Sequence, residues 1–278
     1  MKMYKMVKKM PGKVISGCLL ALSVSCAYSG TMGPEVVNAG KVYVGVFGGG
    51  GALSSVDIRQ YGTAFFTEAV GGPLAVNAFG SAKSSSVGMV GGHIGFAWNN
   101  ISVMQLMPAV ELEGYYIGGA ELKGHDISDN TTRLPEHDFL VTYPLKSGVF
   151  LANAVLGANN SLFGRFKPYV GVGLGVAVQS ISDARSIQVS PPELGVNHYD
   201  SNPNDKALAF AAQPKIGVRF DLSAHTSVFA EYRFLYLSQT NYTFGSTVAA
   251  GHAPTSPWLA TIKPQNYNMG TVGIDFDV

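Results

Sequence analysis

The sequence predicts an all-β fold, an eight-stranded antiparallel up-and-down transmembrane β-barrel, and three observations lead to this prediction. Apolar and polar residues alternate along many segments, the connections between these segments are short and long in turn, and the charges within the segments fall on one face. Successive side chains of a strand point to opposite faces. A barrel in a membrane is apolar outside and polar within, with short turns at one end and long loops at the other.

Residues 1–29 have the pattern of a secretory signal peptide. The stretch MKMYKMVKKMPGK is positively charged, VISGCLLALSVSCA is apolar, and small residues around Ala27 offer a cleavage site. The apolar run is shorter than the roughly 20 residues of a membrane helix, and no later run reaches that length. Cys18 and Cys26 both lie in this segment. The mature chain is therefore expected to have neither a disulfide nor a cysteine-based metal site.

Eight segments read as strands, in chain order at about 41–53, 85–98, 101–122, 136–157, 164–181, 206–221, 226–244 and 263–277. The connections after the second, fourth and sixth are short, namely Asn99-Asn100, ANNSLFG and SAHT, whereas the others are long and polar. This alternation predicts a barrel in the bacterial outer membrane, formed by residues 41–278, with both termini in the periplasm. Residues 30–40 are expected to be a short periplasmic segment.

Alternation also orients the strands. In PAVELEGYYIG, Val110 and Leu112 point outward, and the same reading sends Ile216, Val218 and Val272 outward in later strands. The charges expected in the lumen are Glu111, Glu113, Lys167, Lys215, Arg219, Glu231, Arg233 and Asp275. Eight strands enclose a lumen that side chains can fill, and unpaired buried charges are strongly penalised. We therefore expect four acids and four bases to form a salt-bridged plug. The fourth segment, FLVTYPLKSGVFLANAVL, is apolar on both faces and its orientation stays open.

The glycines of PYVGVGLGVAV fit a strand better than a nucleotide site. Their spacing is G-x-G-x-G, whereas a dinucleotide fingerprint needs G-x-G-x-x-G between a strand and a helix. Glycine in a strand often marks the close approach of another group. Gly171, Gly173 and Gly175 share one face, so we expect them to make room for charged side chains of neighbouring strands. His93 is expected to face the same lumen.

Several segments carry a resemblance to a known family. KVYVGVFGGG, PAVELEGYY, FKPYVGVGLGVA, VFAEYRFLY and YNMGTVGIDFDV, in this order, resemble the small OmpA-type and opacity-type eight-stranded outer-membrane barrels, which include surface antigens of Gram-negative bacteria. The resemblance implies outer-membrane lipid and lipopolysaccharide as surroundings, and a barrel-assembly machinery that reads the C-terminal strand. Family members usually end in an aromatic residue, whereas this chain ends in Val278 with Phe276 two residues earlier. We expect no peptidoglycan-binding domain after the barrel segments, so the wall-anchoring role of longer relatives is not expected here.

The sequence favours a non-enzymatic surface protein that uses no cofactor. Its six histidines are scattered without H-x-x-x-H or HExxH spacing, and both HYD at 198–200 and HTS at 225–227 read as ordinary loop or turn composition. With a net charge of +1, nucleic acid is not an expected partner. Binding residues tend to lie on loops, so a host or matrix ligand is expected there, near aromatics predicted to be exposed: Phe65, Phe66, Tyr199 and Trp258.

Three other readings stay open at this point. An outer-membrane enzyme acting on lipid A or peptides would need a catalytic constellation formed across strands, which sequence alone does not reveal. A narrow porin-like channel would need an open lumen. A lipocalin-like binder has eight strands in the same order but an apolar interior, opposite to the pattern read here.

Overall fold

The computed structural model describes residues 40–99, 106–158 and 164–278. The predicted signal peptide with Cys18 and Cys26, residues 30–39, the turn at Asn100 and most of ANNSLFG lie outside the described residues. Within the described part, no helix is long and apolar enough to cross a membrane. The helical element seen there is a 3₁₀ turn, η1 (Glu68–Val70).

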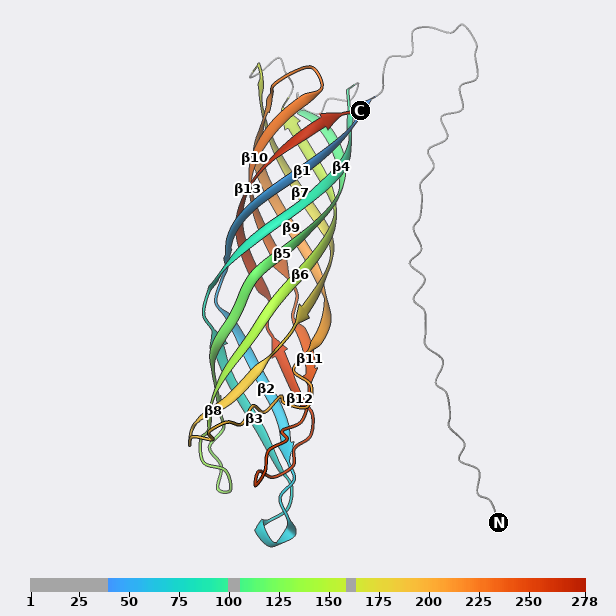
Figure 1. Cartoon of the computed structure of the whole chain (residues 1–278). Helices are drawn as coiled ribbons and strands as arrows, with labels where there is room; N and C mark the ends of the chain where they lie inside the picture. Colours follow the sequence, from blue (N-terminus) through green and yellow to red (C-terminus); the bar gives the residue numbers. More distant parts are fainter. Residues whose placement is uncertain (1–39, 100–105, 159–163) are drawn as a thin grey trace, which may run out of the picture. The chain divides into compact units, whose positions relative to one another are not determined.

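Long antiparallel strands form a closed ring (Figure 1). In ring order they are β1 (Gly40–Leu53), β4 (Ser85–Trp98), β5 (Leu106–Ser128), β6 (Asp138–Ala158), β7 (Phe166–Ile181), β9 (Asp205–Asp221), β10 (Thr226–Leu237) and β13 (Gln265–Asp277), and β13 pairs back with β1. Each strand pairs antiparallel with its neighbours. The predicted class, an all-β up-and-down barrel, is confirmed.

Five further strands lengthen the sheet at the end away from the C-terminus (Figure 1). They are β2 (Val56–Ala64), β3 (Leu74–Ala82), β8 (Arg185–Ser190), β11 (Thr240–Phe244) and β12 (Trp258–Ile262). β3 pairs with β5, β2 with β3 and β12, β12 with β11, and β8 with β6. We use the name loop extension for these five strands, the ends of β5 and β6 that pair with them, and the loops that connect all of these strands at this end. The prediction that these connections are polar loops is therefore wrong, because they contain strands. The segment 226–244, predicted as one strand, forms two strands, β10 and β11.

A loop segment lies between the two edge strands of the loop extension, β8 and β11. The His198 N–H donates to the Ser186 carbonyl on β8 at 2.9 Å, and the Gly245 N–H, directly after β11, donates to the Asn202 carbonyl at 2.8 Å. Because both edges find backbone partners in residues 197–204, the loop extension is tied together around its circumference.

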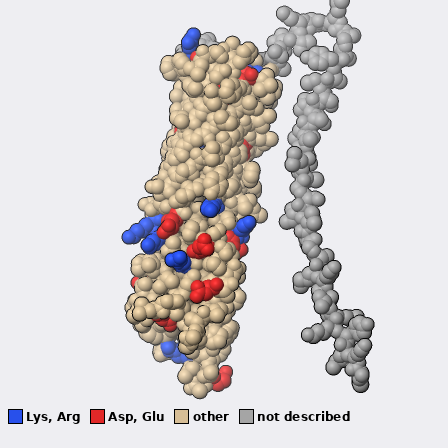
Figure 2. Space-filling model, viewed as in Figure 1, with Lys and Arg blue, Asp and Glu red and all other residues tan. Residues whose placement is uncertain are grey.

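The two faces of the ring differ as predicted. Val46, Val90, Leu112, Val172 and Val272 point outward and are 59 to 66% exposed. Figure 2 shows an outer surface almost free of charge along the ring, whereas Lys, Arg, Asp and Glu gather over the loop extension. Exposed charged residues there, and on the neighbouring ends of the ring strands, include Asp57, Arg59, Lys83, Glu121, Lys123, Lys146 and Lys206. An uncharged band therefore surrounds the ring.

The structure orients β6, which the sequence left open. Phe150 is 59% exposed on the outside, whereas Val149, Leu151 and Asn153 are buried inside. This strand reads as apolar on both faces because its inward residues are mostly apolar too. At the depth of the charged side chains its inward residue is Asn153, whose amide donates to Glu113 at 3.2 Å.

The glycines of β7 do make room, but for three kinds of neighbour. A Cβ on Gly171 would lie 3.2 Å from the Lys215 side chain, which agrees with the prediction. A Cβ on Gly173 would overlap the Asn153 side chain, and one on Gly175 would overlap the carbonyl oxygen of Phe150. Gly175 thus serves the packing of backbones rather than of charges.

Candidate functional site

The charges inside the ring form a connected network. Lys215 lies on β9, and its Nζ is 2.6 Å from Glu111 Oε2, 3.2 Å from Glu113 Oε2 and 3.8 Å from Glu231 Oε2. Arg233 on β10 pairs with both Glu113 and Glu231. These side chains are at most 1% exposed. We call Glu111, Glu113, Lys215, Arg219, Glu231, Arg233 and Asp275 the lumen network.

Tyrosines and rings fill the spaces around these charges. The Tyr43 hydroxyl donates to Glu111 Oε1 at 2.7 Å, and the Tyr169 hydroxyl donates to Glu231 Oε2 at 2.9 Å. The guanidinium carbon of Arg233 lies 4.0 Å from the centre of the Phe47 ring. Hydrogen bonds to carboxylates and a cation over an aromatic face both compensate for lost hydration.

Lys167 is not part of this network, so the predicted set of four acids and four bases is wrong by one base. Its ammonium pairs instead with Asp221 at the end of the ring. Asp275 contacts Arg219 Nε at 2.7 Å, and His93 Nε2 donates to its Oδ1 at 2.9 Å. Sequence could place Lys167 on the inward face but not at this depth, because strand tilt decides which inward residues share a level.

Two of the four predicted exposed aromatics are buried, so that prediction is wrong for Tyr199 and Trp258. Tyr199 is 0% exposed and its hydroxyl donates to Gln60 Oε1 at 2.7 Å. Trp258 is 2% exposed because it begins β12 and points inward. Phe65 and Phe66 are 48% and 37% exposed in the connection between β2 and β3. The loop extension therefore has its own core.

A carboxyl group lies inside the loop extension without a hydrogen-bond partner. Asp126 on β5 is 0% exposed, and neither of its carboxylate oxygens has a partner among the described residues. Burial, with a smaller contribution from Asp138, raises the pKa of Asp126 to about 7. Burial disfavours the charged form of a carboxyl group. This side chain holds a proton over most of the acidic range.

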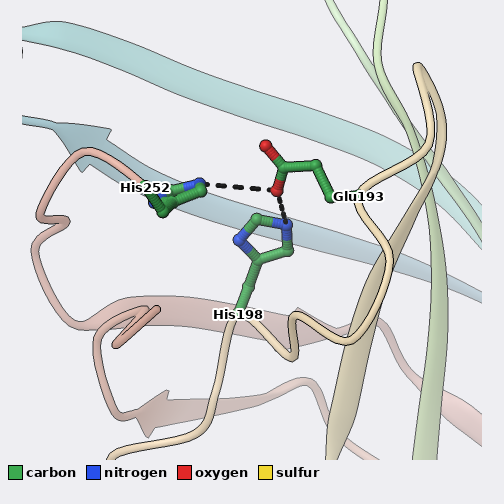
Figure 3. Close-up of side chains that lie close together, drawn as sticks. All are labelled: Glu193, His198 and His252. Atoms are coloured by element: carbon green, nitrogen blue, oxygen red, sulfur yellow. Dashed lines mark ion pairs between the residues drawn. The ribbon is translucent and has the colours of Figure 1, made fainter. Parts of the chain in front are cut away.

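Three other polar side chains converge in the loop extension (Figure 3). Glu193 and His198 come from the connection between β8 and β9, and His252 comes from the connection between β11 and β12. Glu193 Oε2 lies 3.7 Å from His198 Nε2 and 3.5 Å from His252 Nε2. We call these residues the loop-histidine cluster. They border a cavity of about 210 Å³ together with Phe66, His137, Phe139 and Trp258.

The sequence did not predict this cluster. It placed His198 in a solvated loop, whereas His198 is 2% exposed and packs against Phe139 and Trp258 at ring-centre distances of 5.2 and 5.6 Å. Burial, followed by the nearby His252 and His137, lowers the pKa of His198 to about 4. Spacing motifs detect ligands on one element, and His198 and His252 lie on different loops. His225, from the other motif considered, is exposed in the short turn after β9.

No protein-family model and no curated protein sequence matches this chain. Among solved structures it is similar to Neisserial surface protein A, with a TM-score of 0.39 and 12% identity over 84% of this chain and 96% of that chain. It is similar to outer membrane protein OprG from Pseudomonas aeruginosa, with a TM-score of 0.38 and 14% identity over 85% and 96%. For the outer membrane protease OmpT from Escherichia coli the values are 0.35, 8%, 85% and 97%.

Proposed function

We propose that the chain is a non-enzymatic outer-membrane barrel whose ring is a closed scaffold and whose loop extension meets the cell's surroundings. The observation that carries this proposal is the distribution of polar and apolar side chains over the two faces of the ring. Its outside is an uncharged apolar band, and its inside is the lumen network. A soluble barrel such as a lipocalin has the opposite arrangement, whereas a barrel in lipid is apolar outside and polar within.

Aromatic side chains at the end of the ring away from the loop extension support this location. Phe166 and Phe276 are 57% and 44% exposed, and the Phe166 and Phe220 rings lie 4.8 Å apart on neighbouring strands. Aromatic girdles mark the interfaces of outer-membrane barrels. We propose that the chain is a relative of the OmpA-type and opacity-type barrels. Lipopolysaccharide would then surround the part of the ring that lies in the outer leaflet of the membrane. The assembly machinery then reads β13, where Phe276 replaces a terminal aromatic residue.

The location is tested by fractionating the bacterium and running the protein with and without boiling on a detergent gel. We expect the protein in the outer-membrane fraction, with a mobility that changes on boiling because the closed ring resists detergent until heated. Protease added to whole cells should cut the connection between β2 and β3 and spare β13. A soluble periplasmic protein with the same mobility before and after boiling would refute the proposal.

The connection between β2 and β3 is the part of the loop extension best suited to bind a partner. Phe65 is 48% and Val70 is 62% exposed there. Exposed apolar groups on a loop held by a rigid scaffold are typical of recognition sites. We therefore propose an adhesin-like role toward a host or matrix ligand.

The adhesin-like role is tested by replacing residues 65–72 with a two-residue turn. We expect attachment of whole bacteria to host cells or matrix to fall, while the heat-dependent mobility stays unchanged. Val248→Ser, at an apolar position that is 65% exposed in the connection between β11 and β12, is the control. Equal attachment by all three strains would remove the adhesin role and leave a structural barrel.

A further inference from the structure

The three residues of the loop-histidine cluster face one another through atoms that can bind a metal. One ligand atom from each of Glu193, His198 and His252 lies within 4.8 Å of the other two. Figure 3 shows both imidazole rings directed at the same carboxylate. At 3.5 and 3.7 Å, the two nitrogen-to-oxygen distances are too long for good hydrogen bonds.

Hydrogen bonds behind the rings determine where the imidazole protons lie. His252 Nδ1 lies 2.6 Å from the Ala253 carbonyl, which can only accept, so Nδ1 carries the proton. Behind His198, the Thr247 hydroxyl donates to the His198 carbonyl at 3.3 Å and accepts from Trp258 Nε1 at 3.2 Å. It therefore accepts from His198 Nδ1, at 3.1 Å. In the neutral form of each ring, the Nε2 lone pair faces Glu193.

This arrangement leaves the facing atoms without partners. His198 Nε2 and Glu193 Oε2 are both buried and have no hydrogen-bond partner among the described residues. When both rings are neutral, two nitrogen lone pairs and a carboxylate oxygen are directed at one point, and a metal cation between them would relieve their repulsion. Histidine ligands of metals commonly donate their other N–H to a carbonyl or another acceptor, as these two rings do.

A second group of three potential ligands does not lead to the same conclusion. His93, Glu111 and Glu113 also converge, inside the ring. There, however, the Lys215 ammonium lies 2.6 Å from Glu111 and 3.2 Å from Glu113. In that group the lysine ammonium already occupies the place of a cation between the carboxylates. Among the described residues, by contrast, no lysine or arginine forms an ion pair with Glu193.

We propose that Glu193, His198 and His252 form a binding site for one divalent transition-metal ion of the Zn²⁺ type. Two imidazoles and one carboxylate suit zinc, whereas Ca²⁺ and Mg²⁺ prefer oxygen ligands. Ligand atoms about 2.1 Å from a tetrahedral zinc lie about 3.4 Å apart, close to the observed 3.5 and 3.7 Å. The ion ties the connection between β8 and β9 to the connection between β11 and β12.

The test uses untagged protein purified from the outer membrane in detergent, treated with EDTA and titrated calorimetrically with Zn²⁺ at neutral pH. We expect one saturable zinc per chain, undiminished by excess Mg²⁺ or Ca²⁺. Glu193→Gln and His252→Ala should each weaken binding at least tenfold. His125→Ala is the matched control, because His125 is an exposed histidine of the same loop extension outside the cluster, and it should bind zinc as the parent does.

Two further measurements separate a metal site from a folding defect. Thr247→Val removes the acceptor behind His198 and should weaken zinc binding about tenfold or more, while the mobility of the unboiled protein stays unchanged. Zinc should also slow protease cleavage within residues 245–257 in the parent but not in Glu193→Gln. Absence of saturable zinc binding by the parent, or equal affinity in the parent and both ligand variants, would overturn the proposal.

Discussion

The charged side chains inside the ring are tolerated there because each has a partner of opposite charge. The Arg233 side chain is 0% exposed, and it forms ion pairs with both Glu113 and Glu231. Lys41 pairs with Asp277 at 2.5 Å as well, but its side chain is 40% exposed. The buried pairs of Arg233 have lost their hydration, whereas the exposed pair of Lys41 has kept most of it. An exposed charge can replace its partner by water at little cost in stability.

We expect Arg233→Met to lower the free energy of unfolding by about 3 to 5 kcal/mol, because it leaves two buried carboxylates short of a cation. Lys41→Met should cost less than about 1 kcal/mol. Urea unfolding of both variants in detergent micelles, followed by tryptophan fluorescence, measures the difference. Similar losses in the two variants would contradict the assigned roles.

Asp126 gives the loop extension a dependence on pH. In the folded chain the pKa of Asp126 is raised to about 7, whereas the ordinary pKa of an aspartate side chain is 3.8. Between these values the folded state binds more protons than the unfolded state. The free energy of unfolding therefore falls as pH rises through this window, by at most about 1.4 kcal/mol per pH unit, and levels off above it. Asp138 is the charged group that adds to the shift.

Asp126→Asn should remove this slope and leave the protein more stable than the parent above pH 7. Urea unfolding midpoints between pH 4 and pH 9 test it. Asp57→Asn, at an exposed position of the loop extension, is the control and should keep the parent's slope. Parallel curves for the parent and Asp126→Asn would show that the carboxyl group titrates normally.

At the scale of elements, each strand of the ring separates an apolar outer face from the charged lumen by alternation alone. On β7, Val172 is 61% exposed on the outside, while Gly171 and Gly173 line the inside. We expect Val172→Arg to cost about 2 to 4 kcal/mol, because the charge meets hydrocarbon. Leu259→Arg, on the loop extension where Leu259 is 49% exposed, should be nearly neutral. Unfolding in lipid vesicles compares them, and equal costs would refute the lipid-facing assignment.

The strands of the ring could be predicted because alternation is a local property of the sequence. The strands of the loop extension could not, because short elements such as β12 acquire their identity from a distant partner, β2. The burial of Tyr199 has the same origin, since its hydroxyl needs Gln60. The loop-histidine cluster joins residues of two separate loops, and only the folded chain brings them together.

At the scale of the whole molecule, we expect the lumen network to close the ring to ions. We expect the parent protein to show no stable conductance in a planar bilayer. The double variant Glu113→Ala/Arg233→Ala removes one charge of each sign, so it enlarges the lumen without changing its net charge, and it should conduct. A parent protein that conducts steadily, at the level of the double variant, would favour the narrow channel reading instead.

The pairing of β1 with β13 also sets an order of events. Tyr43 lies opposite Asp277, and the Val278 N–H donates to the Val42 carbonyl at 2.9 Å. The first strand of the ring must therefore wait, with one edge unsatisfied, until the last has been synthesised. An exposed strand edge is prone to pair with other chains. We therefore expect chaperones that shield such edges to have their greatest effect during this interval, and a chain interrupted before β13 to stay open to proteolysis.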